Sequence, residues 1–95
     1  MEISNITIRK FINEEKLKAI ASVTFDNMFV VHDIKIIQGE KGLFLAMPSK
    51  KFSDRNYRDI AHPINLKMRD MLENAVLDAY KEKVEEIKNS NIEEI

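Results

Sequence analysis

The chain of 95 residues contains no cysteine, no tryptophan, two glycines and two prolines. Without cysteine it has no disulfide, no thiolate ligand for zinc and no cysteine nucleophile, which suits a reducing compartment. Two glycines are too few for the loops that cradle phosphate in P-loop and dinucleotide-binding proteins. No apolar run approaches the roughly 18 residues of a membrane-spanning helix, and no basic, apolar leader follows Met1. We therefore expect a cytoplasmic protein without membrane insertion.

What is present is a globular composition. Of the residues, 44% are hydrophobic and 33% are charged, in a chain of 11.1 kDa. That size supports a single hydrophobic core. We expect one domain over residues 1–88, followed by a short, frayed acidic tail at 89–95.

The net charge of -1 hides an uneven distribution. Residues 1–40 are nearly balanced, residues 41–69 carry seven Lys or Arg against two Asp, and residues 70–95 carry an acidic excess. Clustered cations keep a local field when distant carboxylates lie beyond a screening length of about 8 Å. The middle segment is therefore the place to look for an anionic partner.

Residues 17–25 alternate apolar and polar side chains, which predicts a half-buried strand. Asp26 and Asn27 tolerate positive φ and predict a tight type I′ turn into a second strand over 28–37. The predicted pairs are Phe25 with Met28, Val23 with Val30, Ala21 with His32, Ala19 with Ile34 and Leu17 with Ile36. This register places His32 on the inward face. The outward face holds Ile20, Phe29, Val31 and Ile37, which is apolar enough to suggest a covering layer or a subunit interface.

Alternation at Ile6, Ile8 and Ile12 predicts a strand before this hairpin, and both glycines precede a short apolar strand over 43–47 that Pro48 ends. From Leu66 apolar residues recur at three- and four-residue steps, which predicts one long amphipathic helix. Asn65 is its expected N-cap, and residues 89–91 its expected end. The predicted fold is α+β, an antiparallel meander of three to four strands packed with one C-terminal helix.

A long connection of about sixteen residues without clear periodicity lies between Met47 and Asn65, so we expect it to be either disordered or functional. Lys50, Lys51, Arg55 and Arg58 lie in it, and Lys67 and Arg69 follow in the first turn of the helix. Cations at a helix N-terminus oppose its dipole and attract phosphate. The alternative is that these cations only solvate a surface loop. Phe52 and Tyr57 stack on bases or anchor the loop to the core, and we favour anchoring.

Catalysis has little support in this sequence. The two histidines are far apart and lie in no ligand-spaced cluster, so we expect no metal site and no cofactor. Ser49 or Ser53 can be combined with His62 and Asp59 into a possible nucleophilic trio. A catalytic triad, however, is defined by its geometry and not by the residue types that a chain contains. We expect His62, before Pro63, to be a structural anchor, and we predict no enzyme.

Three linked segments resemble the SpoVG family of bacterial septation regulators. They are residues 29–34 (FVVHDI), 42–50 (GLFLAMPSK) and 58–65 (RDIAHPIN), and the likeness extends over about residues 1–80. The chain differs at residues 52–57, where the family often has a Pro-Asp-Gly turn, and at the helix start, which is usually richer in Ser and Thr.

This resemblance implies a homodimer that binds DNA and RNA and influences septation, sporulation or virulence gene expression. It associates Lys50, Lys51, Arg58 and Arg69 with nucleic-acid contacts, whereas Arg55 and Lys67 are added on charge alone. The alternative is a protein-interaction module for division proteins at the septum, using the apolar face of Ile20, Phe29 and Val31 and the acidic end of the helix. The homodimer also follows from the apolar outward face predicted for so small a chain.

Overall fold

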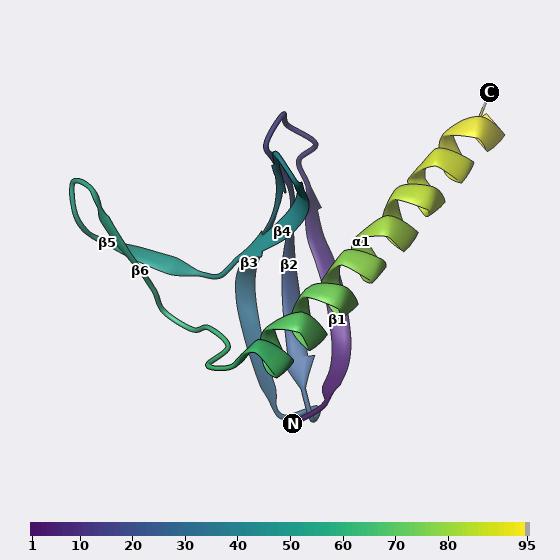
Figure 1. Cartoon of the computed structure of the whole chain (residues 1–95). Coiled ribbons are helices and arrows are strands. Elements are labelled where there is room, and N and C mark those ends of the chain that lie inside the picture. The colour runs from purple at the N-terminus through teal and green to yellow at the C-terminus, as the bar shows by residue number, and fades with distance from the viewer. Residues whose placement is uncertain (95) are drawn as a thin grey trace.

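The computed structural model describes the backbone of residues 1–94 and the side chains of residues 1–88. A four-stranded sheet, a separate two-stranded hairpin and one long helix make up the chain, which confirms the predicted α+β class (Figure 1). The homodimer stays a prediction. The elements are β1 Ile3–Phe11, β2 Leu17–Phe25, β3 Phe29–Gly39, β4 Gly42–Ala46, β5 Ser49–Ser53, β6 Asn56–Asp59 and α1 Leu66–Glu94.

The main sheet is an antiparallel meander in the order β1-β2-β3-β4, as predicted. Asp26 and Asn27 have φ of 51° and 54°, and the N–H of Met28 donates to the carbonyl of Phe25 over 2.9 Å. The positive φ angles predicted for Asp26 and Asn27 in the turn between β2 and β3 are therefore confirmed. The next turn, at residues 40–41, leads into Gly42, whose φ of 130° suits a residue without a side chain.

The predicted register of β2 and β3 is wrong. Met28 stays outside the ladder, which begins with Phe25 opposite Phe29, so Val23 pairs with Val31 and not with Val30. With Met28 in the loop, every pair near the turn moves by one residue. Val31 then faces the covered side and packs against the core, although the sequence placed it outward.

A β-bulge at His32 and Asp33 corrects the alternation farther along β3. Val23 pairs with Val31 and Ala21 with Ile34, so both His32 and Asp33 lie opposite Ser22. Asp33 takes φ of 63°, a left-handed conformation that Asp tolerates better than most residues. The extra residue returns Ile34 to the covered face. His32 follows the inward-facing Val31 and lies on the opposite, exposed face, so the inward position predicted for His32 is wrong.

One face of the sheet is covered by α1, and the core lies between them (Figure 1). Leu72, Val76 and Tyr80 follow one another at four-residue steps along the helix and are buried against the sheet. Burying one such apolar side chain contributes roughly 1.5–3 kcal/mol to folding. Phe11 stacks on Tyr80 with ring centroids 5.4 Å apart, and burial raises the pKa of the Tyr80 hydroxyl.

The helix begins where the sequence predicted. The N–H of Met68 donates to Oδ1 of Asn65 over 2.8 Å, which confirms Asn65 as the N-cap. The helix backbone continues to Glu94, so the predicted end at residues 89–91 is wrong. The frayed tail predicted at 89–95 involves side chains outside the described residues and stays a prediction. Among the described residues, no helix combines the length and the apolar character that crossing a membrane requires.

We expect the bulge at Asp33 to control the stability of the sheet. Asp33→Val places a β-branched residue in a left-handed conformation, which costs roughly 1–2 kcal/mol, whereas Asp33→Gly accepts this φ without strain. Urea unfolding of the two variants and of Asp33→Asn measures the difference. If Asp33→Val proved as stable as Asp33→Gly, the bulge would not depend on the left-handed backbone.

Candidate functional site

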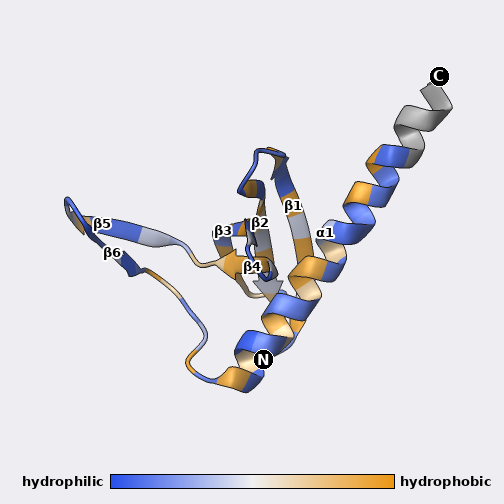
Figure 2. Ribbon diagram, turned by 45° about the horizontal axis from the view of Figure 1, so that its top comes forward, coloured by the Kyte–Doolittle hydropathy of each residue, from blue (hydrophilic) through white to orange (hydrophobic). Residues whose placement is uncertain are grey.

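The connection predicted to be disordered or functional is a β-hairpin. Strands β5 and β6 pair with each other, and the hairpin extends away from the main sheet and from α1 (Figure 1). Every residue of both strands is exposed, and Figure 2 shows the hairpin as largely hydrophilic. A ribbon without a buried side cannot be held in place by hydrophobic packing. Its side chains are therefore available to a partner.

Four of the six predicted site residues lie on this hairpin. Lys50 and Lys51 are on β5, Arg58 is on β6, and Arg55 lies in the turn between them. Lys50 is directly opposite Arg58 in the ladder, a like-charge pair that destabilises a ribbon by a few tenths of a kcal/mol, up to about 1. None of the four forms an ion pair within the part of the chain that the structure describes. The hairpin thus holds uncompensated positive charge.

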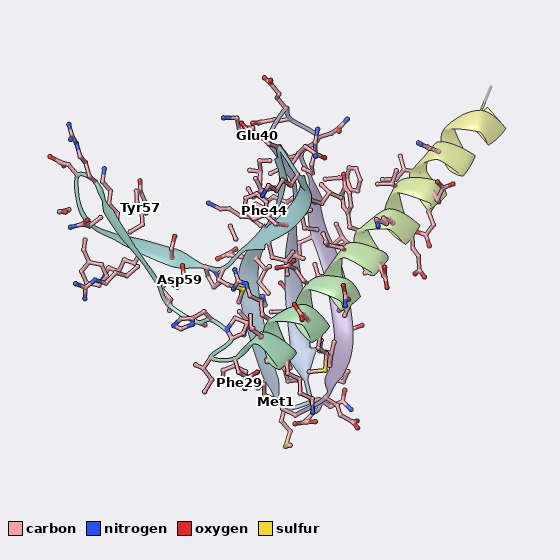
Figure 3. All side chains as sticks on the ribbon, viewed as in Figure 1. Met1, Phe29, Glu40, Phe44, Tyr57 and Asp59 are labelled. Atoms are coloured by element: carbon pink, nitrogen blue, oxygen red, sulfur yellow. The ribbon has the colours of Figure 1, made fainter. Side chains whose placement is uncertain are left out.

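Two aromatic side chains accompany these cations. Phe52 and Tyr57 are 61% and 64% exposed, so the predicted anchoring of the loop to the core is wrong. The guanidinium carbon of Arg58 lies 5.0 Å from the ring centroid of Phe52, a cation–π arrangement, and Tyr57 pairs with Lys51 across the ladder. Figure 3 shows Tyr57 on the hairpin, far from Phe29. Both rings are available for stacking on nucleic-acid bases.

The other two predicted site residues, Lys67 and Arg69, are exposed in the first turn of α1. That turn contains no acidic residue, so the free amides of the helix start and the Lys67 ammonium add to one another. Nε of Arg69 lies 3.8 Å from Oε2 of Glu73, and a pair with this exposure is weak. The six cations form two groups, the hairpin group and the helix-start group, and not one cluster (Figure 1).

The nucleophilic trio that can be written from the sequence does not assemble. His62 Nδ1 donates to the carbonyl of Pro63 over 3.0 Å, so the imidazole is hydrogen-bonded to the neighbouring residue of the same loop. Ser49 lies opposite Asp59 on the hairpin, without a hydrogen bond to His62. Within the described residues, no group of three His, Asp or Glu is placed to hold a metal ion.

An apolar recess lies at the end of the sheet beside the helix start. Its volume is about 310 Å³, and Phe25, Phe29, Met47 and Pro63 are among the residues that line it. Phe29 is 62% exposed and lies near Met1 at this end of the sheet (Figure 3). The predicted apolar outward face of Ile20, Phe29 and Val31 does not exist as one surface, because Val31 packs on the core side.

The hairpin was not predicted from the sequence, because the alternation of apolar and polar residues that indicates a strand arises only when one face of the strand is buried. Alternation reveals a strand when apolar residues face a core, and residues 49–59 have none to face. The turn residues Asp54 and Arg55 between two short runs were the available indication.

The comparisons with known proteins agree with one another. The profile of the SpoVG family matches residues 1–82. A protein of Clostridioides difficile, named "Putative septation protein SpoVG", is 60% identical over 82 residues, which cover 86% of this chain and 89% of the relative. Relatives of the same name from Agathobacter rectalis and Clostridium perfringens are 55% and 52% identical. The first of these alignments covers 92% of this chain and the second 99%, and both cover 100% of the relative. The chain belongs to the SpoVG family.

Proposed function

We propose that the protein is a nucleic-acid-binding regulator, active as a homodimer, that binds DNA and RNA through the hairpin group and the helix-start group. The observation that carries this proposal is the exposed hairpin, where unpaired cations alternate with exposed aromatic rings. The resemblance to the SpoVG family extends the proposal to septation, cell division, sporulation or virulence gene expression. The proposed activity is binding, without catalysis.

The charge arrangement supports a polyanionic partner. Lys50 and Arg58 repel each other across the ladder, and a phosphate between them replaces that repulsion with two attractions. Contacts of Lys and Arg with phosphates release counterions and supply most of the sequence-independent affinity. With about four phosphates neutralised on duplex DNA, the logarithm of affinity should fall with the logarithm of salt at a slope of about -3.6.

The aromatic rings indicate how bases take part. Base stacking on an exposed ring contributes about 1–3 kcal/mol and requires an unstacked base. Phe52 and Tyr57 can offer such platforms to single strands, whereas a duplex keeps its bases stacked. Charge-driven binding to duplex and single strands with an added stacking contribution for single strands is the expected profile.

Removing the hairpin cations should weaken binding of every sequence. We expect Lys50→Ala/Arg58→Ala to lose about tenfold in affinity for a single-stranded oligonucleotide, since each surface contact contributes up to about 1 kcal/mol. The salt slope should become shallower by about 1.4, because about 0.7 is lost for each single-strand phosphate contact. Fluorescence anisotropy across a salt series measures both quantities.

A matched control removes two cations from elsewhere in the molecule. Lys16→Ala/Lys83→Ala changes the net charge equally, in the loop between β1 and β2 and far along α1. We expect this control to bind nearly as the parent does. Equal losses in both double variants would mean that net charge, and not the hairpin, determines binding.

A protein-interaction module is the second candidate function, and the exposed Phe29 beside the apolar recess favours it. An exposed apolar end of this kind also suits a second copy of the chain. In this account the recess joins proteins, either the two copies of the homodimer or division proteins, and nucleic-acid binding is incidental.

Phe29→Asp separates these functions. We expect the parent to show a dimer mass by light scattering at micromolar concentration and Phe29→Asp to show a larger monomer fraction, with circular dichroism verifying the fold. If division proteins captured by the parent are lost on Phe29→Asp but kept by Lys50→Ala/Arg58→Ala, the second function is favoured. A parent that is monomeric at these concentrations would contradict the homodimer.

A further inference from the structure

The face of the sheet that α1 leaves uncovered carries a hydrogen-bonded group from three neighbouring strands. Arg9 of β1 and His32 of β3 both bond to Ser22 of β2, which lies between them. Ser22 is only 4% exposed, whereas Arg9 and His32 are exposed. A buried hydroxyl thus holds two nitrogen-bearing side chains at the surface.

The hydrogen bonds to Ser22 leave donors on Arg9 and His32 that can bind a ligand. Nε of Arg9 donates to Ser22 Oγ over 2.7 Å, and Oγ lies 2.8 Å from Nδ1 of His32. Since guanidinium accepts no hydrogen bond, the Ser22 hydroxyl can donate to Nδ1 of a neutral ring that carries its proton on Nε2. In a cationic ring Nε2 also carries a proton. His32 therefore offers an Nε2–H donor in this tautomer and in the cationic ring.

Both donors come from irregular positions in their strands. Ile8 pairs with Ala21 and Lys10 with Ile20, so Arg9 is the extra residue of a bulge in β1. His32 belongs to the bulge in β3 on the other side of Ser22. Bulges re-aim side chains and are frequent beside functional sites. Two bulges that flank one buried serine bring Arg9 and His32 to the same point.

Further positive charge lies beside this group on the same face. Ile20 of β2 is paired with Lys10 of β1 on one side and with Lys35 of β3 on the other. These three side chains form a second row across the sheet, next to the row of Arg9, Ser22 and His32. No carboxylate forms an ion pair with Arg9, Lys10 or Lys35 among the described residues. Asp33 is the one acidic residue within the bulge, and it is exposed. The local balance of charge therefore favours an anion.

We infer that Arg9 and His32 form a phosphate-binding site on the uncovered face, with Ser22 as its positioning residue and Lys10 and Lys35 at its border. Because Ser22 binds Nε of Arg9, the Nη groups of the guanidinium can donate to the ligand. Nε2–H of His32 adds a donor that approaches the ligand from another direction. Since both side chains bond to one oxygen atom, a single phosphate group can reach donors from each.

The phosphate is assigned to a nucleic-acid backbone, and this step rests on the proposed function. A recess of about 250 Å³ lies between the uncovered face and the base of the hairpin, and it is lined by Asp33, Lys35, Pro48 and Ser49 among others. A strand bound along the hairpin can therefore continue over the sheet toward Arg9. Free inorganic phosphate offers the same chemistry, so the experiment separates the two sources.

The first measurement uses inorganic phosphate and the imidazole signals of the intact protein. The chain has two histidines, so His62 serves as an internal reference. We expect phosphate, added at constant pH and ionic strength against chloride, to shift the His32 ring signals saturably and to leave His62 unchanged. Arg9→Gln should abolish the shift, and Ser22→Ala, which keeps every charge, should reduce it. Equal or unsaturable shifts of both rings would overturn the site.

The second measurement tests the nucleic-acid assignment by anisotropy with a single-stranded oligonucleotide. We expect Arg9→Gln to weaken binding about fivefold and to make the salt slope shallower by about 0.7, while Lys83→Gln, with the same change of charge, has little effect. Loss of binding in Lys50→Ala/Arg58→Ala with no change in Arg9→Gln would overturn this inference and leave the proposed function standing. A phosphate shift at His32 in a protein that binds no oligonucleotide would refute both the nucleic-acid assignment and the proposed function.

Discussion

The packing of one helix on one face of a four-stranded sheet is the constraint on which the rest of the structure depends. Leu72, Val76 and Tyr80 bury the sheet residues that face α1, and this contact supplies most of the apolar burial. Within residues 1–94, which the structure describes, no second helix covers the other face. The uncovered face and the hairpin therefore stay at the surface, and the cations of both proposed sites lie there or at the helix start.

The bulge at His32 and Asp33 connects this packing with the surface chemistry. Without it, the shifted register near Met28 would turn Ile34 away from the core, so the bulge is required for burial. The register shift at Met28, which makes this bulge necessary, also places His32 beside Ser22 on the uncovered face. The loop at Met28 and the bulge together satisfy the core and place a polar group at the surface. A left-handed Asp33 accepts the backbone strain of this arrangement.

Much of this fold could be predicted because its signals are local. The left-handed pair at Asp26 and Asn27, the cap at Asn65 and the apolar stripe of the helix each depend on a few neighbouring residues. The β3 register and the hairpin could not be predicted, since a bulge breaks the alternation and an exposed ribbon has none. Among the candidate cations, Arg55 and Lys67 were identified by charge alone, whereas the other four also rest on the resemblance to the SpoVG family. Their division into two groups, and the partnership of Arg9 with His32, appear only once the strands are paired.

The most direct test of the account is a map of backbone amide chemical-shift changes when a short single-stranded DNA is added to the intact protein. The account predicts saturable changes in β5 and β6, in the first turn of α1 and around Arg9, Ser22 and His32. Amides in the middle of α1, behind the covered face, should stay unchanged. Changes centred on Phe29 and the apolar recess, with the hairpin unaffected, would contradict it.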